Sequence, residues 1–309
     1  NMKGKTDNDT VLVTGGSGMV GRRLTLLLNN RGYSVRVLSR KKVLIPGANV
    51  FTWDYGSHFI EPGALTGVSH IIHLAGESIG NGRWTASRKR EIVDSRVLSA
   101  NLLFEKVRDE GLKLKSFISS SATGYYGAVT SDIIFEETDL PGRDFAASTC
   151  VSWEDSASRF STLSKRVVVI RTGIVLSENG GMLGQLLPVV RSGVSPLPGS
   201  GKQWIPWIHI DDLCAIYARA ISCNPINGTY NGVSPAPVTY KALINAAAKT
   251  LGKKIFTFAT PELRKDGLRR KIPGYPPWKQ GLLPGKPNRP LIFAYLAFQW
   301  HLRTCSGKE

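Results

Sequence analysis

In the stretch TVLVTGGSGMVGRRL, residues 10–24, an apolar run leads directly into three evenly spaced glycines. Residues 10–14 form a short run that is mainly apolar and β-branched, which is typical of a buried strand. Gly15, Gly18 and Gly21 follow the strand. After them comes the apolar stripe of a helix that lies on a sheet: Val20, Leu24, Leu27 and Leu28. A strand, a glycine turn and a helix in this order predict the first unit of a dinucleotide-binding domain.

Each glycine of this turn has its own expected role. Gly15 permits the sharp exit from the strand, Gly18 lets a pyrophosphate approach the backbone, and Gly21 lets the helix pack close to the strand. The helix N-terminus then offers free N–H groups and a positive dipole end to the phosphates. We therefore expect cofactor contacts along the turn, at Gly15, Ser17, Gly18, Met19, Val20 and Gly21. The alternative is a tight turn that binds no ligand.

The end of the second predicted strand indicates which dinucleotide would bind. NAD-specific sites place an Asp or Glu there, which accepts a hydrogen bond from the ribose 2′-OH. This chain instead has Ser39 and Arg40, followed by Lys41 and Lys42. A guanidinium and a hydroxyl bind a 2′-phosphate, which a carboxylate would repel. The sequence thus predicts NADP(H), and the alternative is a solvated basic strand end.

From residue 10 to about 176, short β-rich runs alternate with helical stretches, which predicts right-handed crossovers and a parallel sheet covered on both faces. The last predicted strand is RVVVIRTGIVLS, residues 166–177. The expected fold class is α/β, a Rossmann-like doubly wound parallel sheet with a smaller, interleaved C-terminal α/β lobe.

The expected organisation has four segments. Residues 1–9 would be a leader or cloning remnant, and residues 10–177 the NADP-binding domain. Residues 178–261 would form the interleaved substrate lobe, since Gly/Pro-rich loops begin there. Residues 262–309 form a basic, proline-rich tail with little regular structure to predict.

Composition narrows the partners. The formal net charge of +17 suits an anionic ligand, an anionic membrane surface or nucleic acid. We expect no nucleic-acid role, because the chain carries no aromatic-rich RNA motif and no DNA-reading module. The longest late apolar run, residues 291–298, is too short to span a bilayer, so no membrane span is expected.

The cysteines and histidines do not predict a metal site. The four cysteines form no C-x-x-C pair, and the histidines never fall at ligand spacing with a carboxylate. We expect reduced thiols and a reducing intracellular compartment, either the cytoplasm or an organelle entered with a transit peptide that is then removed.

Several segments together resemble a known family: TGGSGMVGRRL, HLAGESI, DSRVLSANLL, SATGYYG, GSGKQWIPWIHIDDL and NGVSPAPVT. They are similar to the extended short-chain dehydrogenase/reductase superfamily, and within it to the atypical epimerase-like subfamily. The resemblance implies a Rossmann-like domain, NADP(H) and an oxidoreductase or epimerase activity on a small-molecule substrate. It implies cofactor contacts at Gly15, Gly18, Gly21, Ser39, Arg40, Leu74, Ala75, Glu77, Glu91 and Arg96, and Val175 at the nicotinamide end.

Some of these residues have a second interpretation. Glu77 follows the fourth predicted strand, where ligands of open α/β sheets collect, but it could be a surface carboxylate. Glu91 and Arg96 lie on a predicted helix over residues 84–103 and point either into the cleft or into solvent.

The catalytic group is the open question. Superfamily enzymes use a Tyr with a Lys four residues on, plus a substrate-holding Ser, which Ser121 matches. Aligning the next helix puts Ala146 and Cys150 at the Tyr and Lys positions, and neither can do that chemistry. The only Tyr-x-x-x-Lys string, residues 275–279, lies in the tail and is treated as chance.

Three hypotheses follow. In the first, the protein is an oxidoreductase in which Tyr125 or Tyr126 replaces the missing acid. In the second, it is an NADP(H)-binding sensor or scaffold without turnover. In the third, its basic surface binds RNA or membrane. Trp204, Trp207 and His209 would line a substrate pocket under the first hypothesis, or the two indoles would pack between the lobes.

Overall fold

A computed structural model describes residues 9–80, 82–128, 132–178 and 180–260. In these residues one large sheet has the strand order β12-β7-β6-β5-β1-β2-β3-β4. Its strands are β1 (Thr10–Thr14), β2 (Ser34–Ser39), β3 (Ala48–Asp54), β4 (Phe59–Ile60), β5 (Val68–His73), β6 (Ser116–Ala122), β7 (Val167–Thr172) and β12 (Gly228–Gly232). All neighbours run parallel except β3 and β4. The predicted Rossmann-like parallel sheet is confirmed.

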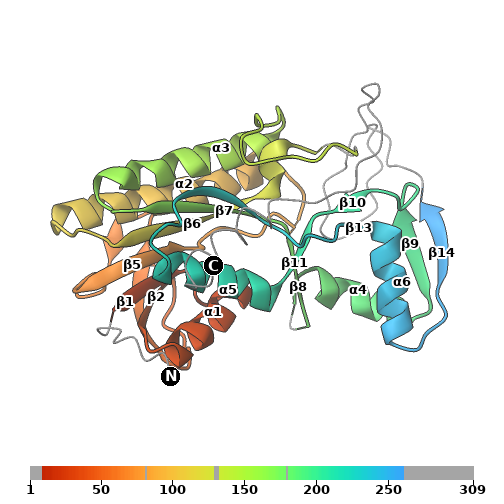
Figure 1. Cartoon of the computed structure of the whole chain (residues 1–309), viewed down its shortest axis with the longest axis horizontal. Coiled ribbons are helices and arrows are strands. Elements are labelled where there is room, and N and C mark those ends of the chain that lie inside the picture. Colours follow the sequence, from red (N-terminus) through yellow and green to blue (C-terminus); the bar gives the residue numbers. More distant parts are fainter. Residues whose placement is uncertain (1–8, 81, 129–131, 179, 261–309) are drawn as a thin grey trace, which may run out of the picture.

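Helices cover both faces of this sheet (Figure 1). One face carries α1 (Met19–Asn30) and α5 (Ile210–Ser222), and the other carries α2 (Ala86–Asp109) and α3 (Phe145–Ser158). Side chains alternate along each strand, so Val11 and Val13 enter the first core while Leu12 enters the second. The near-continuous apolar strands of the sequence therefore serve two separate cores.

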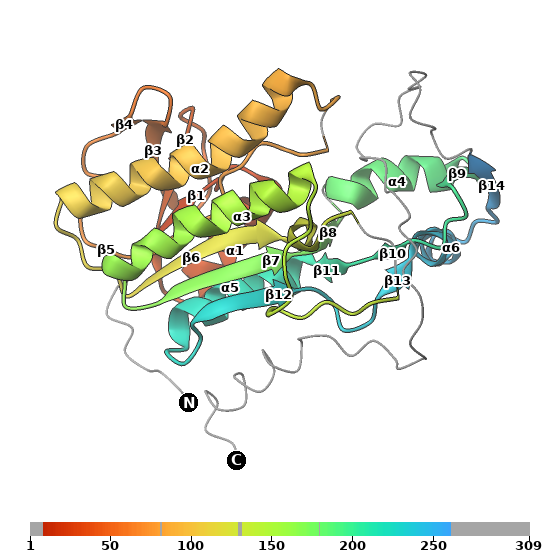
Figure 2. The same cartoon turned by 90° about the horizontal axis from the view of Figure 1, so that it is seen from above.

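The smaller lobe lies beyond the carboxyl ends of the large strands (Figure 2). It contains α4 (Gly181–Arg191), α6 (Tyr240–Thr250) and three strand pairs. The pairs are β8 (Ile174–Ser177) with β11 (Trp207–His209), β9 (Val194–Pro198) with β14 (Phe256–Thr260), and β10 (Trp204–Ile205) with β13 (Val238–Thr239). Between these segments the chain returns to the large sheet through α5 and β12. Two short 3-10 helices complete the set, η1 (Thr123–Tyr126) and η2 (Arg159–Thr162).

One predicted element is wrong. The strand expected over residues 166–177 ends at Thr172, and the chain then leaves the large sheet. Gly173 N–H donates to Gly232 O at 3.0 Å, and Ile174 N–H donates to Pro206 O at 2.7 Å. A methyl group added at Gly173 would lie 2.6 Å from Pro206 O, so only glycine fits this crossing. The apolar pattern continues across Gly173, but its second half pairs with β11.

Parts of the predictions fall outside the described residues. These are nearly all of the predicted leader, the tail over 262–309, and Cys305. Within the described part of the chain, no helix is both long and apolar enough to cross a membrane. The same residues hold no group of three His, Cys, Asp or Glu side chains placed to bind a metal. Cys150 and Cys214 are free thiols.

Candidate functional site

The glycine turn brings the end of β1 against the end of β5. Gly15 has φ +67°, and a methyl group on it would lie 2.8 Å from Leu74 O. Gly18 N–H closes the turn by donating to Gly15 O at 3.0 Å. A methyl group on Gly21 would lie 2.5 Å from Gly15 O and against Gly16 Cα. The close approach of these backbones therefore requires glycine at Gly15 and Gly21.

The N-terminus of α1 fits a phosphate group. Gly18 is the N-cap residue, no side chain caps the helix, and its first turn holds no acidic residue. Ser17 and Gly18 are exposed, while Met19 and Val20 are half-buried. First-turn N–H groups that no side chain satisfies, together with the positive dipole end, form a cradle for an anion.

A buried hydrogen-bond chain fixes the turn that follows β5. Thr14 Oγ1 accepts from Leu74 N–H at 3.2 Å and from Ala75 N–H at 3.1 Å. The same oxygen lies 2.9 Å from His73 Nδ1, and His73 Nε2 lies 3.3 Å from Ser99 Oγ on α2. A neutral imidazole with its proton on Nε2 satisfies all these contacts. The positions of Leu74 and Ala75 beside the glycine turn thus depend on a neutral His73.

This histidine makes stability depend on pH. Burial lowers the pKa of His73 to about 4, so the folded protein keeps the ring neutral while the unfolded chain binds a proton below its ordinary pKa. The contribution of His73 to the free energy of unfolding should therefore fall by about 3 kcal/mol as the pH drops from about 6.5 to about 4. Urea unfolding at several pH values checks this. His73→Asn should lose clearly less stability than the wild type over the same range, and parallel curves for the two proteins would contradict the assignment.

Charged residues at the same edge of the sheet form a cluster, the Glu77 cluster, made of Arg40, Glu77, Arg88 and Glu91. Arg40 Nη1 lies 2.8 Å from Glu77 Oε1. Arg88 Nη1 lies 3.6 Å from Glu77 Oε2 and 2.5 Å from Glu91 Oε2. Glu77 is thus ion-paired on both sides and is more than an isolated surface carboxylate.

Of the other predicted cofactor residues at this edge of the sheet, some are buried and some are exposed. Ser39 is buried, and its Oγ lies 3.4 Å from Lys41 N, whereas Arg40 is exposed. Arg96 is buried, donates to Glu77 O at 3.0 Å and lies over the Trp153 ring. Burial lowers the pKa of Arg96 to about 10. Of the two residues on α2, Arg96 therefore supports the turn from below, and Glu91 faces outward.

Ser121, at the end of β6, belongs to a buried polar cluster that the sequence did not reveal. Its Oγ donates to Glu154 Oε1 at 2.6 Å. Glu154 receives two parallel hydrogen bonds from Arg171, each 2.9 Å long. The side chains are 4% exposed for Arg171 and 14% for Glu154, so this is a largely desolvated ion pair. Arg171 lies in the apolar run of β7, and a charge in such a strand requires a partner, which was the available signal.

The two candidate tyrosines meet the same arginine in different ways. The guanidinium carbon of Arg171 lies 3.3 Å from the centroid of the Tyr125 ring. Tyr126 OH donates to Asn231 Oδ1 at 2.7 Å and lies 3.1 Å from Arg171 Nη1. Burial raises the pKa of Tyr126, and its hydroxyl is already engaged. Tyr125 is the more exposed of the two.

Ala146 and Cys150 lie next to this cluster on α3. A methyl group on Gly124 would lie 3.5 Å from Ala146 Cβ and 3.8 Å from Cys150 Sγ. The Cys150 thiol lies 3.7 Å from Ala122 O, and burial raises its pKa to about 11. A neutral thiol and a methyl group therefore lie beside η1, where the superfamily pattern calls for a Lys and a Tyr.

The aromatic segment before α5 is held at the lobe boundary. Trp204 Nε1 donates to Asp132 Oδ1 at 2.9 Å, and Trp207 Nε1 donates to Ala236 O at 2.8 Å. Trp204 is exposed and Trp207 is half-buried. His209 caps α5 by accepting from Asp211 N–H. Val175 pairs with Ile208 across β8 and β11.

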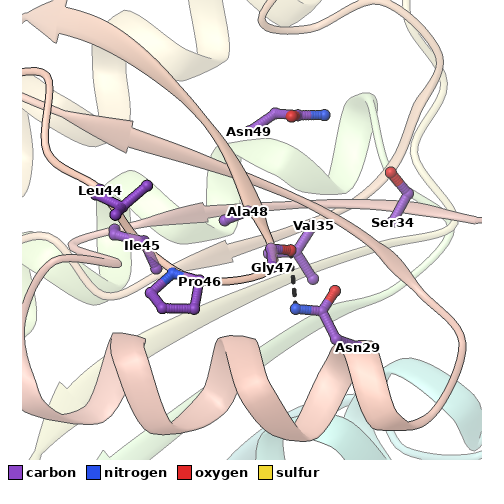
Figure 3. Close-up of a pocket in the computed structure, with 9 residues that line it drawn as sticks. All are labelled: Asn29, Ser34, Val35, Leu44, Ile45, Pro46, Gly47, Ala48 and Asn49. Carbon is purple, nitrogen blue, oxygen red and sulfur yellow. Dashed lines mark hydrogen bonds between the residues drawn. The ribbon is translucent and has the colours of Figure 1, made fainter.

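A cavity of about 420 Å³ lies elsewhere, by the amino ends of β2 and β3 (Figure 3). Its walls include Ser34 and Ala48, the first residues of those strands. Asn29 Nδ2 donates to Gly47 O there at 2.8 Å and fixes the loop. Because the glycine turn follows the carboxyl end of β1, this cavity lies at the opposite edge of the sheet and includes none of the predicted site residues.

Comparison with known proteins places the chain in a family. The sequence model of the NAD dependent epimerase/dehydratase family matches residues 11–231, which include the glycine turn, the Glu77 cluster and Ser121. The chain belongs to this family. The predicted resemblance to epimerase-like proteins of the extended dehydrogenase/reductase type is thereby confirmed.

Individual relatives agree with the family. The chain is 35% identical over 251 residues to the human epimerase family protein SDR39U1, which covers 80% of this chain and 82% of the relative. The crystal structure of human SDR39U1 (isoform 2) with NADPH superposes with a TM-score of 0.72 at 31% identity, covering 82% and 83% of the two chains. A nucleoside-diphosphate sugar epimerase from Corynebacterium glutamicum has a TM-score of 0.64 at 38% identity, covering 80% of this chain and 52% of the other.

Proposed function

We propose that this protein binds NADP(H) at the glycine turn and acts on a small organic substrate as an oxidoreductase or epimerase. The observation that carries the proposal is the pairing of an uncapped helix N-terminus with Arg40 at the end of β2, where NAD-specific sites have a carboxylate. The structure of human SDR39U1 with NADPH supports the same cofactor. Residues 10–177 would hold the cofactor, and residues 178–261 would contribute the substrate lobe.

The proposed cofactor contacts follow from these positions. The pyrophosphate would lie on the glycine turn, and the 2′-phosphate would contact Ser39 and Arg40. The remaining proposed contacts are Leu74, Ala75, Glu77, Glu91, Arg96 and, at the nicotinamide end, Val175. A bound nicotinamide would supply or accept a hydride.

Ser121 and Tyr125 are the proposed catalytic residues. The Ser121 proton is directed at Glu154, so the role we propose for its oxygen is to accept a hydrogen bond from a substrate hydroxyl. Tyr125 is the proposed proton donor, because the Tyr126 hydroxyl is buried and bonded to Asn231.

One observation favours a second candidate function, an NADP(H)-binding sensor. Ala146 and the neutral thiol of Cys150 replace the Tyr and Lys that make superfamily enzymes efficient. A protein without that pair could bind the cofactor and turn over no substrate.

The phosphate contact is tested by replacing Arg40. Arg40→Gln should weaken NADPH binding about 10- to 100-fold, because a charge-assisted hydrogen bond to the phosphate is lost, and should change NADH binding by no more than about twofold. Isothermal titration calorimetry measures both constants. Arg31→Gln removes the same charge from the C-terminal end of α1 and should change neither. Unchanged NADPH affinity in Arg40→Gln would refute the contact.

Turnover separates the two candidate functions. Nicotinamide absorbance is followed with a panel of aldehydes, ketones and sugar nucleotides, the last included because of the Corynebacterium relative. Turnover that is lost in Tyr125→Phe and in Ser121→Ala supports the proposed enzyme. Turnover that survives Tyr125→Phe but not Ser121→Ala removes only the tyrosine's role. Tight NADPH binding without turnover on any compound favours the sensor.

A further inference from the structure

Arg40 and Glu77 reach toward each other from the two loops that flank the glycine turn. Strand β1 lies between β5 and β2 in the parallel sheet, so all three carboxyl ends meet at one edge. Arg40 directly follows β2, and Glu77 lies in the turn after β5. Their 2.8 Å ion pair therefore joins these loops beside the turn that would carry the pyrophosphate.

We propose that Glu77 occupies Arg40 in the free protein and competes with the 2′-phosphate of NADPH for it, so that Glu77 sets how strongly NADPH is preferred over NADH. The inference rests on the proposed cofactor site. A 2′-phosphate must take Arg40 from Glu77 before it gains the guanidinium. A 2′-hydroxyl is uncharged and gains little from that exchange, so the competition acts on NADPH alone.

The two partners differ in freedom. Main-chain atoms of Glu77 are held by α2, because its N–H donates to Ser95 Oγ at 2.9 Å and its carbonyl accepts from Arg96 at 3.0 Å. Its side chain is 20% exposed, whereas that of Arg40 is 64% exposed. The exposed Arg40 side chain is therefore the partner that would turn toward a phosphate, and the Glu77 carboxylate stays in place.

The exchange does not leave a carboxylate without a cation. Arg88 Nη1 lies 3.6 Å from Glu77 Oε2, and Arg88 is itself held by donating to Ser78 O at 2.6 Å. When Arg40 turns to a phosphate, Glu77 keeps Arg88 as its partner. The free-energy cost of breaking the Arg40–Glu77 ion pair is accordingly small, in the range of an exposed ion pair. The competition therefore reduces the preference for NADPH over NADH without abolishing it.

Calorimetric titration of four proteins tests this: wild type, Glu77→Gln, Arg40→Gln and the double variant, each with NADPH and NADH. Glutamine keeps the main-chain bonds to Ser95 and Arg96 and removes only the charge. Glu77→Gln should bind NADPH about 3- to 5-fold more tightly than the wild type, and its ratio of NADPH affinity to NADH affinity should rise by about the same factor. In the Arg40→Gln background the same substitution should have no effect.

Two further measurements locate the effect. Adenosine 2′,5′-bisphosphate should reproduce the gain in Glu77→Gln and AMP should not, which assigns the gain to the extra phosphate. Glu105→Gln is the matched control, because it also removes one negative charge. Glu105 lies on α2 and pairs with His58, away from Arg40. This substitution should leave both cofactor affinities unchanged.

The outcomes are distinguishable. If the wild type prefers NADPH but Glu77→Gln binds it no more tightly, the competition is wrong and the cofactor proposal stands. An equal gain in NADPH affinity in Glu105→Gln would show a general charge effect and overturn the inference. So would a gain that persists in the double variant, which lacks Arg40. If the wild type binds neither cofactor, both proposals fall.

Discussion

Gly21→Val should weaken NADPH binding about 100-fold or more and lower the free energy of unfolding by about 3 kcal/mol. The first added carbon would lie 2.5 Å from Gly15 O and against Gly16 Cα, and both are backbone atoms. Relief requires α1 to move away from the glycine turn. That movement would withdraw the helix N-terminus from the proposed pyrophosphate position.

Calorimetry with NADPH and urea unfolding measure the two effects of this substitution. Gly184→Ala is the control, because an added methyl group there, inside α4, meets nothing within 4 Å. It should leave cofactor affinity unchanged and raise stability slightly, since alanine favours a helix over glycine. Gly21→Val that binds NADPH like the wild type would show that the turn is not the cofactor site.

Arg171→Met should lower the free energy of unfolding by about 3–5 kcal/mol, because it leaves the Glu154 carboxylate largely buried without its bidentate partner. Arg171 also lies against Tyr125 and donates to Glu137 O at 3.0 Å, so its loss should loosen η1. Replacing both charges, Arg171→Met with Glu154→Met, should restore much of the lost stability, since no isolated charge remains.

A double-mutant cycle by urea unfolding measures the coupling of this pair. We expect the double variant to be more stable than either single variant. Additive losses would mean that Arg171 and Glu154 contribute independently and that the ion pair does not organise the surroundings of Ser121.

Much of the fold could be predicted from sequence. The glycine turn, the leucine stripe of α1 and the alternation of apolar strands with helices are local patterns, and they led to the parallel sheet. The break at Gly173 was missed because its cause is a contact with Pro206, which is distant in sequence. Strand β12 was missed because Gly228–Gly232 has no apolar run and is set by pairing with β7.

The candidate site divides in the same way. Arg40 could be found because the end of β2 is recognisable once the turn is known. The Glu77 pairing and the Glu154–Arg171 pair could not, because each joins residues from different elements. The residue types at the sheet edge could be predicted from the sequence. The contacts among these residues could be identified only in the structure.

We propose that the basic end of β2 selects a phosphorylated cofactor. The most direct test is a titration of the wild-type protein with NADPH and with NADH at two salt concentrations. NADPH should bind at least about tenfold more tightly than NADH, and this difference in affinity should narrow as salt screens the phosphate. Equal affinities, or a preference for NADH, would contradict it.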